Sequence, residues 1–386
     1  MRYKLLLLLF LIFQNTGFAT HIVGGEINYT HLGNDSFKIE LQLYVDCFNG
    51  NPGAISSDQY ARIAVFSGAA DTLVPELSFE VIRNNPVRVS KTNYNCIKIA
   101  PNACVDAYTY VYYKTLPKVE GGYVLSFQRC CRNNSILNLD DPGGTGANFW
   151  TKINSVDSIT ENSSPYFKNL PPNFLCTNTE LVFDHSATDA DGDSLVYEFF
   201  HPYTGATRTA PRPEVIDYET PPFTQINYLT GYDYQNPIDA LPNILINNST
   251  GELRLKPTMP GQFVIGIVVK EYRNGVLIGF TQRDYQFNVQ NCVFETVSAF
   301  AAPDINCDRQ VIFNNTSENA TSYFWDFGDN TVTDDTSNQS SGTYTYPKVG
   351  KYTVMLIAAT GNCADTQFKE ITIFERLIFD KGKCKL

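Results

Sequence analysis

The sequence lacks an apolar run of the roughly 20 residues that a membrane-spanning helix requires. Its longest apolar run covers only residues 5–13. No segment has the spacing of apolar residues that is typical of an amphipathic helix, and the ten cysteines include no C-x-x-C pair of the kind that binds zinc. We therefore expect neither a transmembrane segment, nor a helical fold, nor a zinc site of that spacing.

Basic residues and histidines are scarce as well. The 29 Lys and Arg residues are outnumbered by 40 Asp and Glu residues, which gives a formal net charge of −11. An acidic chain is a poor candidate for binding nucleic acid, because the phosphates of nucleic acid attract positive charge. There are four histidines, and none lies beyond His201.

Two short strings imitate enzyme motifs but lack the surrounding sequence that the chemistry needs. Residues 22–25 read I-V-G-G, as in trypsin-like proteases, yet neither an Ala-Ala-His-Cys nor a Gly-Asp-Ser-Gly-Gly segment occurs. Residues 192–195 read G-D-S-L, as in a class of esterases that also needs a histidine near the carboxy terminus. We predict that the protein is not an enzyme, with a secreted serine hydrolase as the weakest alternative.

The amino terminus predicts export. Arg2 and Lys4 precede the apolar run, and the small residues Gly17 and Ala19 follow it, which is the layout of a secretory signal peptide at residues 1–19. All ten cysteines lie beyond residue 19, and this suits disulfides in an oxidising compartment better than cytosolic thiols. We expect a secreted, extracellular protein.

Strand patterns predict an all-β fold. The 23 Tyr and 26 Phe residues suit strands better than helices. Residues 37–45 alternate apolar and polar side chains with the two-residue period of a half-buried strand. Residues 263–273 and 276–282 flank Asn274 and Gly275, a pair that predicts a hairpin with a type I′ turn.

The most specific motifs lie near the carboxy terminus. Residues 323–330 read Y-F-W-D-F-G-D-N, which puts Tyr323, Trp325 and Phe327 on one face of a short strand before a turn. Residues 343–347 read T-Y-T-Y-P, and a second strand follows from residue 350. Together these motifs resemble the PKD domain, an extracellular β-sandwich. The resemblance implies a structural role for the motif residues, which are Trp325 in the core and Asp326, Gly328 and Asp329 in the turn.

Four other strings resemble secreted, PKD-containing surface proteins of Bacteroidota, the phylum of gliding bacteria. They are T-H-I-V-G-G-E-I at residues 20–27, Y-V-D-C at 44–47, R-C-C-R-N at 129–133 and E-Y-R-N-G-V-L-I-G at 271–279. The resemblance implies a location at a bacterial cell surface. Members usually extend into a carboxy-terminal sorting domain, so we expect either a truncated tail at residues 377–386 or another export route.

The length of the chain exceeds what one hydrophobic core usually serves, so several domains are expected. Turn-forming residues at 162–165 suggest one boundary. We predict three immunoglobulin-like β-sandwich modules in series. They are an amino-terminal module with Cys130-Cys131 at residues 20–160, a cadherin-like module at 161–293 and the PKD domain at 296–376.

An acidic string in the middle module suggests a metal site. Asp189, Asp191 and Asp193 occupy alternate positions of D-A-D-G-D, and their carboxylates can converge on calcium if the backbone turns between them. With G-E-L at residues 251–253 and P-G-Q-F-V at 260–264, the string resembles cadherin-like bacterial domains, in which such a run lies between strands. The alternative is a solvated acidic turn without a bound ion.

The cysteines suggest two disulfides. Cys307 and Cys363 each lie near the end of a strand in the PKD-like segment, and Cys176 and Cys292 lie near the first and last strands of the middle module, so we predict that each pair is bonded. The remaining cysteines are Cys47, Cys96, Cys104, Cys130, Cys131 and Cys384. Their connectivity stays open.

These features favour a non-enzymatic, exported adhesion or structural protein of the cell surface. It would bind a surface glycan or a protein through loops or sheet faces. The alternative is an accessory carbohydrate-binding part of a secreted hydrolase.

Overall fold

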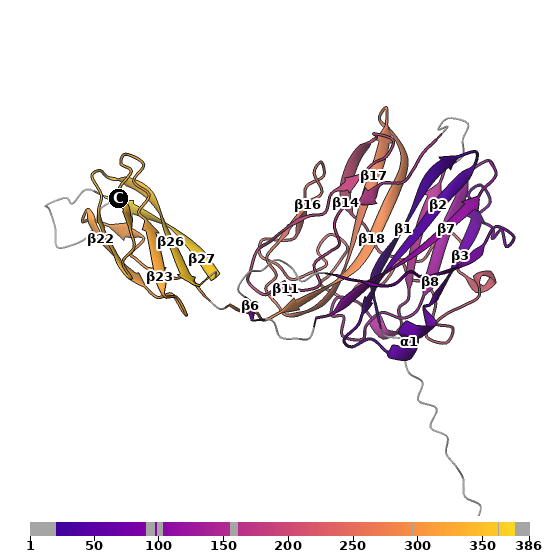
Figure 1. Ribbon diagram of the computed structural model, residues 1–386, viewed down its shortest axis with the longest axis horizontal. Helices are drawn as coiled ribbons and strands as arrows, with labels where there is room; N and C mark the ends of the chain where they lie inside the picture. The colour runs from indigo at the N-terminus through magenta and orange to yellow at the C-terminus, as the bar shows by residue number, and fades with distance from the viewer. Residues whose placement is uncertain are drawn as a thin grey trace, which may run out of the picture. The chain divides into compact units, whose positions relative to one another are not determined.

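The computed structural model describes residues 21–89, 97–98, 103–154, 161–294, 296–361 and 363–374. Two compact units are present (Figure 1). The first unit combines residues 1–92 with 101–291, and the second unit combines 93–100 with 292–386. The predicted signal peptide at residues 1–19 and the predicted tail at 377–386 lie outside the described residues.

Strands dominate both units, which confirms the predicted all-β fold. Within the described residues the helical elements are short: α1 (Pro52–Ser57) and the 3-10 turns η1 (Pro142–Gly144) and η2 (Val215–Asp217). None of the described helices is both long and apolar enough to span a membrane.

The main sheet of the first unit has eight strands. Seven lie in one path, in the order β14 (Ser194–Phe199), β17 (Gly261–Arg273), β18 (Val276–Gln290), β1 (Ile22–Gly33), β2 (Ser36–Asp46), β7 (Val105–Thr115) and β5 (Val87–Arg88). The eighth, β11 (Leu175–Cys176), pairs in parallel with β18. The hairpin predicted around Asn274 and Gly275 joins β17 to β18, and both turn residues have the positive φ of a type I′ turn, 53° and 79°.

Three smaller sheets complete the described part of the first unit. The largest consists of β4 (Phe79–Ile82), β3 (Tyr60–Ser67), β8 (Tyr123–Arg129) and β9 (Ala147–Ile153). The others consist of β12 (Leu181–Asp184), β16 (Glu252–Leu255) and β15 (Leu245–Ile246), and of β10 (Tyr166–Phe167) with β13 (Ala187–Thr188).

The main sheet is covered by hydrophobic cores on both faces. Leu43 and Tyr44 are neighbours on β2 and therefore point to opposite faces. Leu43 packs with the strands of the β4-β3-β8-β9 sheet, whereas Tyr44 packs with residues of β12, β16, β17 and β18. The half-buried strand predicted at residues 37–45 is confirmed at β2, where Phe37 and every second residue after it join the first of these cores.

The boundary predicted between residues 160 and 161 does not separate two compact units. Strand β1, from the predicted amino-terminal module, pairs with β18, from the predicted cadherin-like module, through the partners Gly24–Tyr285 and Gly25–Asp284. Main-chain hydrogen bonds thus run continuously from β14 to β5 across both predicted modules. Residues 21–89, 103–154 and 161–291 belong to one unit, because strands from all three segments share this sheet.

The second unit consists of three described sheets. They are β6 (Ile97–Lys98) with β19 (Val293–Phe294); β20 (Phe300–Ala301), β22 (Gln310–Asn315) and β25 (Gly342–Thr345); and β21 (Ile305–Asn306), β27 (Cys363–Ile373), β26 (Gly350–Thr360), β23 (Ser322–Asp326) and β24 (Thr336–Ser337). Trp325 on β23 pairs in register with Leu356 on β26, and both side chains are fully buried.

Buried ion pairs connect segments of the first unit that are far apart in the sequence. They are Arg283–Glu26, Arg132–Asp284 and Arg129–Asp58, and each of these side chains is at most 3% exposed. Arg129 and Arg132 flank Cys130 and Cys131, which form a buried disulfide with each other. The R-C-C-R string thus provides two buried cations, and Arg132 extends the ionic contacts to β18.

Candidate functional site

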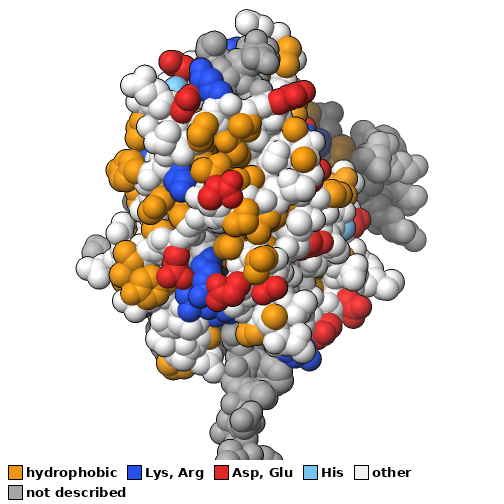
Figure 2. Space-filling view, turned by 90° about the vertical axis from the view of Figure 1, so that its right-hand side faces the viewer, with side chains coloured by type: hydrophobic (Ala, Val, Ile, Leu, Met, Phe, Trp, Pro, Cys, Tyr) orange, Lys and Arg blue, Asp and Glu red, His pale blue; other side chains and the backbone are white. Residues whose placement is uncertain are grey.

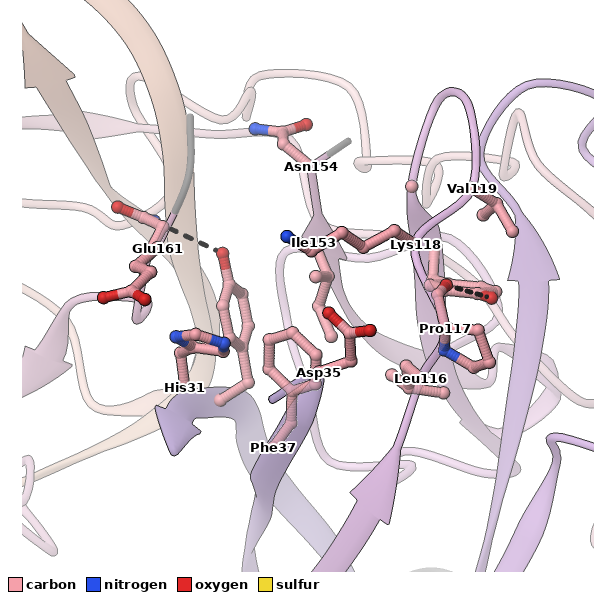
Figure 3. A pocket seen from close by; sticks show the side chains of 14 residues that line it. His31, Asp35, Phe37, Leu116, Pro117, Lys118, Val119, Ile153, Asn154 and Glu161 are labelled. Atoms are coloured by element: carbon pink, nitrogen blue, oxygen red, sulfur yellow. Dashed lines mark hydrogen bonds between the residues drawn. The ribbon is translucent and has the colours of Figure 1, made fainter. Parts of the chain in front are cut away.

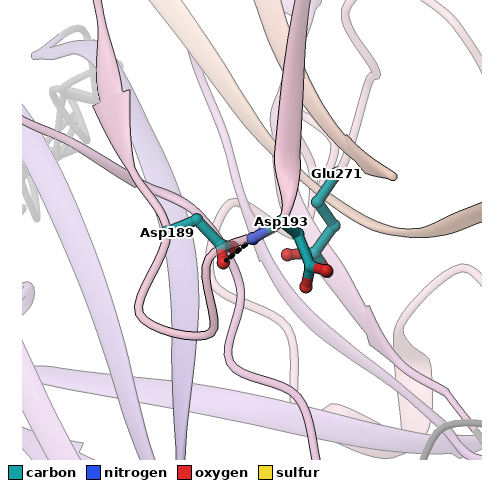
Figure 4. Close-up of side chains that lie close together, drawn as sticks. All are labelled: Asp189, Asp193 and Glu271. Atoms are coloured by element: carbon teal, nitrogen blue, oxygen red, sulfur yellow. Dashed lines mark hydrogen bonds between the residues drawn. The ribbon is translucent and has the colours of Figure 1, made fainter. Parts of the chain in front are cut away.

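Three carboxyl side chains gather on the first unit. Ligand oxygens of Asp189, Asp193 and Glu271 all lie within 4.8 Å of one another, and the side chains point toward each other (Figure 4). Asp191, which the sequence grouped with Asp189 and Asp193, is outside the cluster, because its Oδ2 accepts a hydrogen bond from the Ser163 N–H at 2.6 Å. We call Asp189, Asp193 and Glu271 the carboxyl cluster.

The loop before β14 wraps around the side chain of Asp189. Its Oδ1 accepts the backbone N–H groups of Asp191 at 3.0 Å and Asp193 at 2.8 Å. Gly192 has a φ of +84°, a left-handed conformation that glycine adopts without strain. The loop therefore satisfies Oδ1 and leaves Oδ2 of Asp189 buried without a hydrogen-bond partner.

Glu271 reaches the cluster from β17 and is fully buried. Its Oε1 accepts a hydrogen bond from Asn162, whereas its Oε2 has no partner. Gly279 is the register partner of Glu271 on β18. A Cβ at residue 279 would lie 1.7 Å from Glu271 Oε1, so Gly279 provides the space that the carboxyl group occupies.

Arg273 is the cationic neighbour of the cluster. Its Nε and Nη2 donate to the two carboxylate oxygens of Asp193 at 2.8 and 2.6 Å, and Nη2 also donates to Asn162 Oδ1 at 3.0 Å. The guanidinium group balances one of the three carboxylates. With Glu271 ionised, the cluster and Arg273 together carry two net negative charges.

Burial and the neighbouring Asp189 raise the pKa of Glu271 from 4.5 to about 9. Removal from water penalises the ionised form, and the negative charge of the nearby Asp189 carboxylate favours the protonated one. Without a metal ion, Glu271 is therefore protonated at neutral pH.

The raised pKa of Glu271 predicts how stability depends on pH in the presence of a chelator. The extra proton of the folded state contributes stability that is complete below pH 4.5 and is lost as the pH rises toward about 9. Urea unfolding at pH 5, 7 and 9 measures this loss. Glu271→Gln should remove this part of the pH dependence, and an unchanged slope in that variant would contradict the assignment to Glu271.

The first unit also has an apolar pocket (Figure 3). Asn162 lines this pocket and also donates to Glu271 and to the Tyr29 hydroxyl. Phe37 and Ile153 contribute to the apolar wall, and Asp35 and Lys118 add charged groups. An apolar surface with a few polar groups is typical of small-molecule sites.

The predicted PKD motif residues lie in the core of the second unit and in the turn that follows β23. Trp325 is fully buried, and its Nε1 donates to the Gln339 carbonyl at 3.0 Å. Asp326 accepts the Gly328 N–H, and Asp329 accepts the Thr331 N–H and the Tyr344 hydroxyl. Gly328 has a φ of +75°, and a Cβ there would lie 2.3 Å from the Thr353 carbonyl oxygen. The aspartates therefore hold the turn, and only glycine fits its tightest point.

The predicted Cys307–Cys363 disulfide is wrong. Ile305 and Asn306 lie beside Thr372 and Ile373, whereas Cys363 begins the same strand β27 nine residues earlier. At roughly 3.3 Å per residue the two cysteines are about 30 Å apart, while a disulfide requires Cα atoms within about 7 Å. Each of the two is disulfide-bonded, so each has a different partner.

The other described cysteines are also in disulfides. Cys47 bonds to Cys104 with their Cα atoms 5.2 Å apart, a pairing that the sequence left open. Cys96 and Cys384 lie outside the described residues.

The Cys176–Cys292 disulfide stays a prediction. Both residues are disulfide-bonded, and β11 aligns Cys176 with Gln290, two residues before Cys292. Peptide mapping without reduction should yield one peptide pair that contains both cysteines. Recovery of either one bonded to a different cysteine would contradict the pairing.

The described hydrogen bonds give no support to a serine hydrolase. The rings of His21, His185 and His201 bond to Asp58, Arg283 and the Ile226 carbonyl, and no described bond joins a histidine ring to a serine hydroxyl. Ser194 of the G-D-S-L string begins β14 and is paired with Tyr272 of β17.

A family model of the PKD domain matches residues 297–373. Among solved structures, the PKD1 domain of Vibrio anguillarum Epp is 23% identical and covers 21% of this chain and 95% of its own, with a TM-score of 0.19. The PKD1 domain of the Vibrio cholerae metalloprotease PrtV is 30% identical and covers 20% of this chain and 95% of its own, with a TM-score of 0.18. A structure of Dscam is 10% identical and covers 91% of this chain and 72% of its own, with a TM-score of 0.16. No curated protein matches the chain.

Proposed function

We propose, on the premise that residues 297–373 form a PKD domain, that the protein is a non-enzymatic, exported adhesion or structural component of a bacterial cell surface. The observation that carries the proposal is the state of the cysteines. Every cysteine among the described residues is disulfide-bonded. Disulfides persist in oxidising surroundings such as the periplasm and the cell exterior.

The mechanism is the presentation of two stable β-sheet units that bind through loops and sheet faces. In the first unit, hydrophobic side chains gather among acidic and basic ones on one side (Figure 2). Its β3 and β4 carry exposed apolar side chains, Tyr60 at 42% and Ile82 at 53%. A mixed surface of this kind suits a protein or glycan ligand better than nucleic acid, which the negative net charge disfavours.

Deletion of the gene in the producing organism tests the proposal. The deletion strain should attach less to surfaces or to other cells, and expression of the full-length protein should restore attachment. Normal attachment, combined with binding of the purified protein to a glycan array, would favour the accessory carbohydrate-binding role instead. Hydrolytic activity of the purified protein would overturn the non-enzymatic assignment.

A further inference from the structure

We propose that Asp189, Asp193 and Glu271 bind a divalent cation and that this cation is calcium. The site differs from the one that the sequence suggested, because Glu271 of β17 replaces Asp191 as the third carboxylate. The inference is independent of the proposed function, since it concerns only the chemistry of the first unit.

The unpartnered oxygens of the cluster point to a ligand. Oδ2 of Asp189 and Oε2 of Glu271 are both buried, and neither has a hydrogen-bond partner. Glu271 is fully buried and the Asp193 side chain is 5% exposed. Buried carboxylate oxygens are costly unless they bind a proton, a hydrogen-bond donor or a metal ion. A cation between the side chains would satisfy both oxygens at once.

The net charge of the site matches a divalent ion. Three carboxylates and the Arg273 guanidinium leave two negative charges, which one divalent cation neutralises. Both oxygens of Asp193 already accept from Arg273. An ionised carboxylate has about four acceptor positions, so Asp193 can contact a cation as well as Arg273.

The donor atoms favour calcium over other divalent ions. The cluster offers only oxygen, which suits hard cations, and it contains neither histidine nor cysteine. Calcium accepts six to eight oxygen ligands in irregular geometry and fills the remaining positions with water or carbonyl groups. Magnesium demands a nearly regular octahedron, which three carboxylates from a loop and a strand are less suited to provide.

Binding would fasten the loop at residues 189–193 to the main sheet. Asp189 and Asp193 belong to that loop, and Glu271 belongs to β17. Glu271 also accepts from Asn162, which lines the apolar pocket and donates to the hydroxyl of Tyr29 on β1. A bound cation therefore contacts groups that fix the loop and the wall of the apolar pocket.

Calorimetric titration of calcium into the purified, oxidised full chain, after removal of metals, tests the proposal. The expected result is saturable binding at one site and a rise in the melting temperature of the first unit. Glu271→Gln should abolish both, because glutamine keeps the shape and the Asn162 contact but loses the charge. Asp189→Asn is the second test variant and should show the same loss.

Asp191→Asn is the matched control. It removes one negative charge from the same loop, but the side chain of Asp191 accepts from the Ser163 N–H and makes no hydrogen bond to the cluster. This variant should bind calcium like the original protein. The absence of binding, or equal losses in Asp191→Asn and Glu271→Gln, would overturn the proposal. An equal rise in melting temperature with magnesium or with sodium chloride of matched ionic strength would also overturn it, because this outcome indicates charge screening of an acidic surface.

Discussion

Glu26→Gln is expected to destabilise the first unit by about 3–5 kcal/mol, the usual cost of breaking a buried ion pair by removing one partner. The Arg283 guanidinium donates to both carboxylate oxygens of Glu26, and the two side chains are 1% and 0% exposed. The Arg283 guanidinium also donates to the Asn169 carbonyl and lies over the Phe167 ring, 4.3 Å from the ring centroid. Arginine stays protonated in proteins, so the variant keeps a buried charge without a counter-ion.

Urea unfolding measured by circular dichroism provides the test. Glu252→Gln is the control, because it removes a carboxylate of the same unit whose ion pair with Arg254 is exposed to solvent. Exposed pairs contribute little, so the control should unfold like the original protein. Equal unfolding midpoints for Glu26→Gln and Glu252→Gln would show that the buried pair has no structural importance.

Trp325→Ala is expected to destabilise the second unit by about 3–5 kcal/mol, the usual cost of removing a buried tryptophan. Trp325 is fully buried, and its ring lies 5.1 Å from that of Phe300 and 6.1 Å from that of Phe327, measured between centroids. The substitution removes these contacts and the hydrogen bond from Nε1, and it leaves a cavity in the centre of the core.

Differential scanning calorimetry of the full chain measures this effect. The variant should lower the melting temperature of the second unit and leave that of the first unchanged. Phe324→Ala is the matched control, because Phe324 is the preceding residue on the same strand but is 37% exposed. A similar loss from both substitutions would contradict the assignment of Trp325 to the core.

Local patterns in the sequence predicted local structure. The burial of Trp325 and the hairpin at Asn274 depend on residues close together in the chain, where the two-residue period and the turn chemistry are sufficient. The pairing of β1 with β18 joins residues such as Gly24 and Tyr285, and nothing in either strand identifies its partner. The boundary inferred from the turn residues at 162–165 therefore divided one continuous sheet between two predicted modules.

In the carboxyl cluster, too, the residues close together in the sequence were predicted and the distant one was not. Asp189 and Asp193 were found because they are close in sequence. The prediction included Asp191 because it assumed a turn that would bring all three aspartates of the D-A-D-G-D string together. In the observed loop around Asp189, the side chain of Asp191 instead accepts from the Ser163 N–H. Glu271 was missed because it is brought to the loop by pairing of β14 with β17. Its only signal was the string at residues 271–279, whose two ends are Glu271 and the glycine that makes room for it.

The predicted Cys307–Cys363 disulfide was wrong for a related reason. Strand ends were taken as neighbours, but Cys307 and Cys363 lie toward opposite ends of β27 because β21 pairs in parallel with its far end. Sequence separation gives loop length, whereas pairing depends on register, which sequence alone does not provide.

Labelling of intact cells with an antibody against residues 297–373 tests the central claim most directly. A non-enzymatic, exported surface protein should be labelled on intact cells, and the labelled protein should show no free thiols. Labelling only after the cells are permeabilised, together with reduced cysteines, would contradict the account.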